Sequence, residues 1–235
     1  MTQRTRWKGS CGHDGIPGWP GGFHPARPER SRRPQWVTGG ILVVSFVALL
    51  YVIEGIDTVT GHRLDENGIR PLEADGLDGI LFAPLLHANW GHLVANTVPA
   101  LVLGFLAAAA GLGRFLLATA IIWVLGGVGT WLIGNLGSPY ETNHIGASGL
   151  IFGWLTYVIV RGFFNRRVGQ ILIGVVVIVL YGGVLWGVLP GQFGVSWQGH
   201  LSGAIAGVLA AYWLSGRERK AKAARGPGAP PRLST

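Results

Sequence analysis

Six apolar runs, separated by short polar segments, constrain the fold of this chain more than any other feature. They cover roughly residues 36–56, 89–110, 115–136, 144–164, 170–189 and 197–215. Each run has about 20 residues, the length at which an α-helix spans the hydrocarbon of a bilayer. Because backbone polar groups find no water in lipid, such runs fold as helices. The pattern predicts an all-α membrane protein, a bundle of six transmembrane helices.

The composition agrees with this prediction. Hydrophobic residues make up 49% of the 235 residues and charged residues only 13%, too few for an ordinary soluble domain. Cys11 is the only cysteine, which excludes an intrachain disulfide. Several prolines separate the early basic residues from the first run, so we expect no cleaved signal peptide.

Basic residues set the predicted orientation. With a cytoplasmic N-terminus, all of the 19 Lys and Arg residues except Arg63 and Arg70 fall on the inner side. The positive-inside rule therefore places both termini in the cytoplasm. The first outer segment instead carries acidic residues, namely Asp57, Asp65, Glu66, Glu73, Asp75 and Asp78. The net charge of +8 is then explained by flanks facing anionic membrane lipids, and no nucleic-acid partner is expected.

Three segments are predicted along the chain. Residues 1–35, rich in Gly, Pro and Arg, form a disordered basic cytoplasmic tail. Residues 36–215 form the six-helix domain, and residues 216–235 form a basic cytoplasmic C-terminal tail. We expect a multi-pass protein of the plasma membrane.

Polar side chains are costly in a bilayer and are therefore candidates for function. Glu54 is the only acidic residue within a run, so a paired-aspartate protease is excluded, and no His-Glu-x-x-His zinc motif is present. Among the polar side chains near the outer starts of the second, fourth and sixth runs are His92, Asn96, Ser148 and His200. A rise of 1.5 Å per residue puts each of them roughly 5–10 Å below its helix start. This common depth predicts one shared site.

Ser148 lies between glycines at the start of the fourth run, in Gly146-Ala147-Ser148-Gly149. The glycines suit a nucleophile because they permit a sharp turn and close approach of a substrate carbonyl. Free N–H groups at a helix N-terminus can stabilise an oxyanion. The same stretch also fits a simple helix-packing surface.

His200 is the partner that we predict for Ser148. Glycines spaced four apart accompany both residues: Gly199, Gly203 and Gly207 in one run, Gly149 and Gly153 in the other. Such faces let helices pack closely, as a serine–histidine hydrogen bond requires, although a hydrogen-bonded interface histidine is the alternative. No carboxylate is available to orient His200, so we expect Phe152 to stack on its ring.

The remaining polar residues have alternative interpretations. His92 and Asn96, four apart on one helix face, form with the Ser148 N–H a candidate oxyanion site or, alternatively, an interhelical polar bridge. His87 is expected to tie down the preceding loop, and His144 is a rival base that we rank below His200. No spacing demands a zinc site from these histidines, and we expect neither metal nor cofactor.

Taken together, these residues resemble the rhomboid family of intramembrane serine proteases over roughly residues 36–215. The motifs are His87-x4-His92-x3-Asn96, Gly146-x-Ser148-Gly149 and Gly199-His200-x2-Gly203-x3-Gly207. The resemblance implies Ser148 as nucleophile and His200 as general base. It also implies an oxyanion hole of His92, Asn96 and the Ser148 N–H, with the motif glycines, Phe152 and His87 in support. The chain departs from the family in having Phe152 where Tyr is frequent, and in lacking a Trp-Arg pair within 57–86.

The resemblance implies an intramembrane endopeptidase that cuts single-span membrane proteins through an acyl-enzyme, from a site open to the extracytoplasmic side. Two alternatives stand beside it. One is a catalytically inactive rhomboid-like protein that binds membrane clients. The other is a small transporter that relays protons through histidines, although residues 36–136 and 144–215 show no internal repeat.

Overall fold

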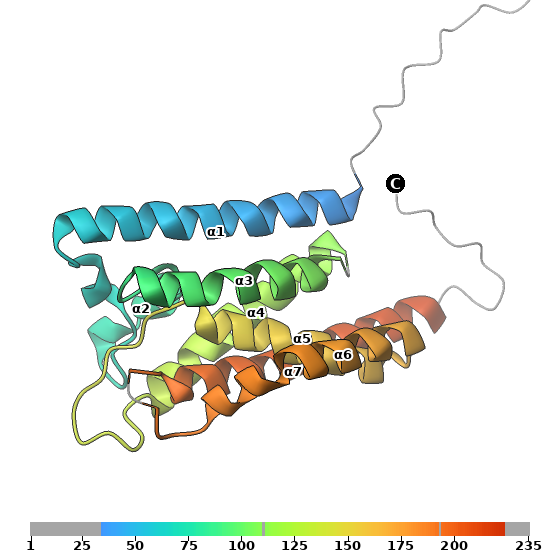
Figure 1. The fold of residues 1–235 in the computed structure, drawn as a ribbon. Coiled ribbons are helices and arrows are strands. Elements are labelled where there is room, and N and C mark those ends of the chain that lie inside the picture. The colour runs from blue at the N-terminus through green and yellow to red at the C-terminus, as the bar shows by residue number, and fades with distance from the viewer. Residues whose placement is uncertain (1–33, 110, 193, 224–235) are drawn as a thin grey trace, which may run out of the picture. The chain divides into compact units, whose positions relative to one another are not determined.

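The computed structural model describes residues 34–109, 111–192 and 194–223, the stretch 217–223 by its backbone alone (Figure 1). The long helices of this part are α1 (Gln35–Thr60), α3 (Trp90–Ala108), α4 (Leu112–Ile133), α5 (Ser148–Asn165), α6 (Val168–Tyr181) and α7 (Trp197–Ala223). Short helical turns join α1 to α3, namely η1 (Leu64–Asn67), η2 (Ala74–Gly76), α2 (Gly79–Phe82) and η3 (Ala83–Leu85). A further turn, η4 (Gly182–Val188), follows α6.

Each long helix matches a predicted run, with shifted ends. Helix α1 continues to Thr60, where Gly61 ends it in the left-handed conformation with φ 75°, so Asp57 lies in the helix rather than in the outer loop. Helix α7 continues past residue 215 to Ala223. The predicted tail of residues 1–35 lies outside the described residues except for its last two, as does the C-terminal tail from residue 224 onward.

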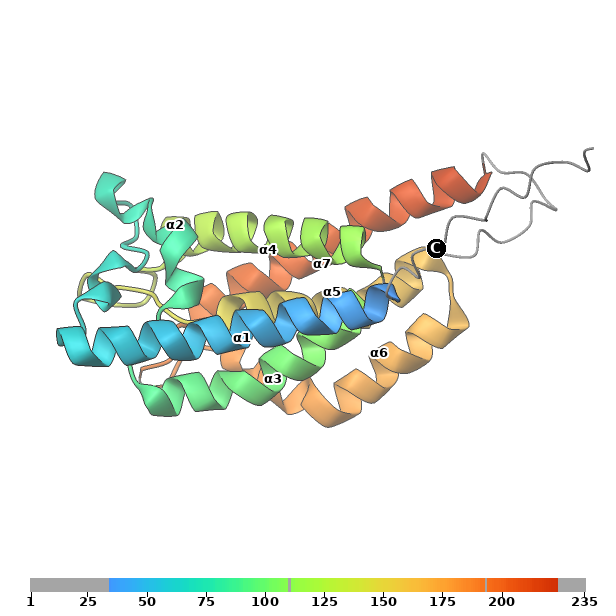
Figure 2. The ribbon, with the colours of Figure 1, turned by 90° about the horizontal axis from the view of Figure 1, so that it is seen from above.

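Four of the described helical stretches are long and apolar enough to cross a membrane: Gln35–Thr60, Trp90–Ala108, Leu112–Ile133 and Val168–Val188. Helices α5 and α7 do not meet that criterion. Helix α5 contacts α3, α4, α6 and α7, and Figure 2 shows it between α4 and α7 on one side and α3 and α6 on the other. Most α5 side chains face other helices and not lipid, so α5 can be less apolar than a helix that is exposed to lipid.

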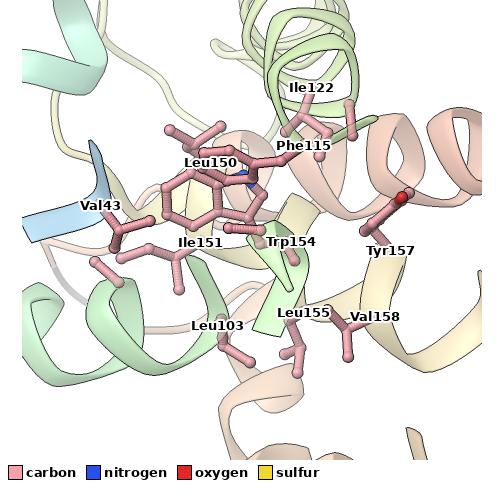
Figure 3. Packing of buried hydrophobic residues seen from close by; sticks show 14 of the residues in the cluster. Val43, Leu103, Phe115, Ile122, Leu150, Ile151, Trp154, Leu155, Tyr157 and Val158 are labelled. Carbon is pink, nitrogen blue, oxygen red and sulfur yellow. The ribbon is translucent and has the colours of Figure 1, made fainter. Parts of the chain in front are cut away.

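The apolar core is built around Trp154 of α5, which is 2% exposed. Figure 3 shows Trp154 among side chains from several helices, including Val43 of α1 and Phe115 of α4. Its ring centroid lies 5.8 Å from that of Phe115, and its indole N–H donates to Thr119 Oγ1 at 3.0 Å. The indole therefore buries its apolar body without leaving its N–H unsatisfied.

The contact between α5 and α7 is the most extensive between any two of the described helices. A Cβ atom added at Gly203 would overlap the carbonyl oxygen of Gly149, and one added at Gly207 would overlap that of Gly153. Only glycine fits at these two positions, so the close packing that the spacing predicts is confirmed. The two backbones touch, which brings the N-terminal turns of α5 and α7 together.

The segment between α1 and α3 is fastened to the helices by two tryptophans of α4. Trp123 Nε1 donates to the carbonyl of Ile80 at 2.9 Å, and Trp131 Nε1 donates to that of Glu73 at 2.8 Å. A single antiparallel bridge pairs Ile69 with His144, just before α5. The segment that we described only as a polar loop is thus tied to the entrance of α5.

We expect Gly207→Ala to lower the stability of the bundle by about 1–3 kcal/mol, because the added methyl group has no room against Gly153. The measurement is thermal unfolding of the purified protein in detergent. Gly216→Ala on the same helix is the matched control, since a Cβ there meets nothing within 4 Å. Equal melting temperatures of the two variants would contradict the packing argument.

Candidate active site

Ser148 and His200 meet at the N-terminal ends of α5 and α7. Ser148 is the first residue of α5, and His200 lies in the first turn of α7. The distance from Ser148 Oγ to His200 Nε2 is 2.9 Å, that of a hydrogen bond. The His200 side chain is largely enclosed, with 9% of the residue exposed. The glycine contact between the two helices thus places a hydroxyl beside an imidazole, as the spacing suggested.

A backbone carbonyl orients the imidazole in the way that a carboxylate does in a triad. His200 Nδ1 lies 2.9 Å from the carbonyl oxygen of Gly187, which can only accept a hydrogen bond. Nδ1 therefore carries the proton in the neutral ring, and Nε2 presents its lone pair to the hydroxyl of Ser148. The tautomer that a general base needs follows from this one contact.

Phe152 fixes the plane of the His200 ring. Its centroid lies 4.1 Å from that of His200 with an angle of 9° between the planes, a stacked arrangement. A Cβ at Gly187 would lie 3.0 Å from Phe152 Cζ and 3.1 Å from His200 Nδ1, so the absence of a side chain there leaves room for the stack. Packing and one carbonyl together fix the position of the imidazole.

Side chains from α3 reach the same place. The His92 ring lies against Gly146, where an added Cβ would be 2.7 Å from His92 Cε1 and 3.7 Å from Ser148 Oγ. Gly146 has φ 118°, a conformation that favours glycine, so the turn into α5 depends on it. One turn further along α3, Asn96 is 8% exposed and its Nδ2 has no hydrogen-bond partner among the described residues. A buried donor without an acceptor is suited to a charge that develops during a reaction.

The N–H of Ser148 is a further donor. As the first residue of α5 it has no carbonyl one turn earlier within the helix, so this N–H is free to bind an oxyanion. The N-terminal end of the helix dipole adds positive potential at the same point.

A small cavity of about 50 Å³ lies beside Ser148, on the side of α4. Its lining includes Ser148, Gly149, Gly199, Thr130 and Ile122. A water needs roughly 10–15 Å³ of such volume, so the cavity has room for more than one water molecule next to the hydroxyl.

The two other candidate histidines, His144 and His87, contact loop residues and not Ser148. His144 Nδ1 pairs with Ser196 Oγ at 2.6 Å, and its Nε2 pairs with Thr142 Oγ1 at 2.7 Å. Ser196 in turn accepts from the N–H of Gly199 at the start of α7. His87 Nε2 accepts a long hydrogen bond from the Ala147 N–H at 3.4 Å. Both rings thus brace the segments that lead into α5 and α7.

The comparison with protein families decides the identity. The rhomboid domain model matches residues 76–217, which include Ser148, His200 and both α3 side chains. The chain belongs to the rhomboid family. Together with the four apolar helices, this membership makes it an integral membrane protein.

The relatives of this chain fall into two groups by sequence identity. An uncharacterised protein of Mycobacterium tuberculosis is 63% identical over 205 residues, covering 86% of this chain and 85% of the relative. An uncharacterised protein of Mycobacterium leprae is 58% identical over 219 residues, 91% of this chain and 86% of the relative. The Bacillus subtilis protein named "Putative rhomboid protease YdcA" is 31% identical over 159 residues, 66% of this chain and 73% of the relative.

Two contributions to this rhomboid site were not found from sequence. The carbonyl of Gly187 acts through its backbone, so no side-chain pattern marks it. Ser196 escaped notice because its partner His144 is 52 residues away, a separation that carries no local signal. Only the packing of η4 and of the loops against α7 brings them to the site.

We expect the stability of the protein to fall between pH 6.5 and about 4 because of His87. Burial, reinforced by the nearby His92, lowers the pKa of His87 to about 4. In this window His87 binds a proton in the unfolded chain but not in the folded chain. Up to about 3 kcal/mol of the free energy of unfolding is therefore present above pH 6.5 and is lost as pH falls toward 4.

The measurement is the melting temperature in detergent across this window, for the wild type and His87→Gln. Glutamine keeps an acceptor for the Ala147 N–H but does not titrate. Its profile should therefore be flatter than that of the wild type. Parallel profiles would show that His87 does not contribute to the acid sensitivity.

Proposed function

We propose that this rhomboid-family chain is an intramembrane serine endopeptidase with Ser148 as nucleophile and His200 as general base. The observation that carries the proposal is the 2.9 Å contact between Ser148 Oγ and Nε2 of His200. His200 takes the serine proton as Oγ attacks the scissile carbonyl, and then gives that proton to the leaving amine. Water hydrolyses the acyl-enzyme and regenerates the serine.

The oxyanion of the tetrahedral intermediate is stabilised from two helices in this mechanism. The Ser148 N–H donates from the start of α5, and His92 and Asn96 donate from α3. The unsatisfied Nδ2 of Asn96 supports this assignment, since it is a donor in place before the charge appears. The cavity beside Ser148 supplies room for the hydrolytic water.

For the membrane topology we propose six spans with both termini in the cytoplasm of a plasma membrane. Residues 36–215 then form the protease domain, in which α5 and α7 cross the membrane together with the four more apolar helices. The positions of the basic residues support this orientation, and it opens the dyad toward the extracytoplasmic side. The substrates are single-span membrane proteins, cut near the outer end of the spanning helix, with lipids as the surrounding medium.

We expect Ser148→Ala to abolish cleavage of a model single-span substrate in proteoliposomes, because no other group replaces the nucleophile. Ser215→Ala is the matched control: this serine is also buried, on α7, and bonds only to the Ala211 carbonyl within its own helix. It should cleave like the wild type. Product formation by a folded Ser148→Ala protein would refute the assignment of the nucleophile.

A fluorophosphonate probe separates the protease from a catalytically inactive relative. Labelling requires an activated serine, so an active enzyme is modified at Ser148 and loses labelling in His200→Ala. An inactive client-binding relative retains its clients and is not labelled. Mass spectrometry of the labelled peptide identifies the residue.

Replacing Asn96 by Ala should lower the rate of cleavage about a hundredfold, equivalent to about 3 kcal/mol, because one oxyanion donor is lost. His92→Ala should have an effect of similar size. Labelling by the probe and single-turnover cleavage measure the chemical step directly. An unchanged rate in both variants would leave these two residues with a packing role only.

A further inference from the structure

A second group of ionisable side chains lies apart from Ser148, where α1 ends and η1 begins. Asp57, His62 and Asp65 each offer one ligand atom, and these atoms lie within 4.8 Å of one another. His62 Nδ1 is 3.3 Å from Asp57 Oδ2 and 3.9 Å from Asp65 Oδ2. The left-handed turn at Gly61 and His62 reverses the chain, which brings η1 back against the last turn of α1.

Glu54 supplies an independent observation at the same place. It is 1% exposed, and neither of its carboxylate oxygens has a hydrogen-bond partner among the described residues. It lies three residues before Asp57, on the same face of α1. Its carboxylate is near enough to Asp57, His62 and Asp65 for the charges to affect one another, although it lies outside the group of three whose ligand atoms are within 4.8 Å.

The cluster lacks positive charge for the carboxylates that it holds. Asp57 is 1% exposed; its Oδ1 accepts from the N–H of Leu64 at 2.7 Å, which leaves Oδ2 toward His62. One oxygen of Asp65 is also buried and has no hydrogen-bond partner in the part of the chain that the structure describes. Two carboxylates, those of Asp57 and Asp65, thus lie within 3.9 Å of a single imidazole whose side chain is 47% exposed, and Glu54 adds a third carboxylate nearby. Buried carboxylates are costly unless they are paired or bind a metal, and one histidine does not balance three of them.

We propose that Glu54, Asp57, His62 and Asp65 form a binding site for one divalent metal cation. Carboxylate oxygens combined with an imidazole nitrogen are the donor set of Mn²⁺ and Zn²⁺, whereas Ca²⁺ prefers oxygen ligands throughout. From the sequence we expected no metal, because no histidine spacing demands a zinc site and because Glu54 falls in an apolar run while the other three residues fall in the outer segment.

The cation would fix the joint between α1 and the segment that leads to the candidate active site. Asn143 Nδ2 donates to the carbonyl of Asp65 at 2.7 Å, and the Ile69–His144 bridge follows a few residues later. Asn143 and His144 belong to the loop of residues 134–147 between α4 and α5. The metal site stands on its own geometry, and its test does not require proteolysis.

The experiment is calorimetric titration of the purified, metal-stripped full chain in detergent with Mn²⁺ and with Zn²⁺, alongside thermal unfolding. We expect one equivalent to bind, with a rise in melting temperature. Glu54→Gln, Asp57→Asn, His62→Gln and Asp65→Asn should each weaken binding at least tenfold. Glu66→Gln is the matched control, because Glu66 is an exposed carboxylate beside Asp65; it should bind like the wild type.

Melting without metal separates ligation from a structural role. Because the carboxylates repel one another when no metal is bound, the melting temperature of metal-free Glu54→Gln should be no lower than that of the metal-free wild type. Adding metal should not raise the melting temperature of Glu54→Gln. Should Glu54→Gln fail to fold, the partly exposed Asp65→Asn carries the same comparison. The proposal is overturned by absence of saturable binding, by binding that survives Glu54→Gln or Asp65→Asn, or by tighter binding of Ca²⁺ than of either metal.

Discussion

The backbone contact between α5 and α7 is the interaction on which the rest of this structure depends. Gly203 meets the Gly149 carbonyl and Gly207 meets that of Gly153, so no side chain separates the two helices. In lipid, helix association relies on such close packing because apolar side chains gain nothing by leaving the solvent. The same contact brings the first residue of α5 within 2.9 Å of the first turn of α7.

His200 is oriented by a backbone carbonyl and an aromatic ring instead of a carboxylate. A charged aspartate at this depth would be costly in a bilayer. The Gly187 carbonyl instead fixes the tautomer of His200, and Phe152 fixes the plane of its ring. A neutral dipole and an aromatic face thus give orientation without adding a buried charge.

The segment between α1 and α3 joins the two ionisable regions of the molecule. Trp123 and Trp131 of α4 donate hydrogen bonds to it, and the Ile69–His144 bridge connects it to the loop just before α5. The carboxylate cluster at its start and the Ser148 site near its end are therefore linked through ordered backbone.

The sequence by itself determined the long helices and singled out the candidate residues of the site. Apolar length marked the six runs. Ser148, His200, His92 and Asn96 stood out inside them because polar groups are costly in lipid, which makes those that are present candidates for function. The sequence placed the helix ends less accurately. Helix α1, for example, continues through the polar residue Asp57, whose carbonyl is capped by the N–H of Gly61. Only the tertiary structure revealed the Gly187 carbonyl, the Ser196–His144 pair and the gathering of carboxylates around His62. Backbone groups and partners distant in sequence leave no periodic pattern, so folding alone brings them together.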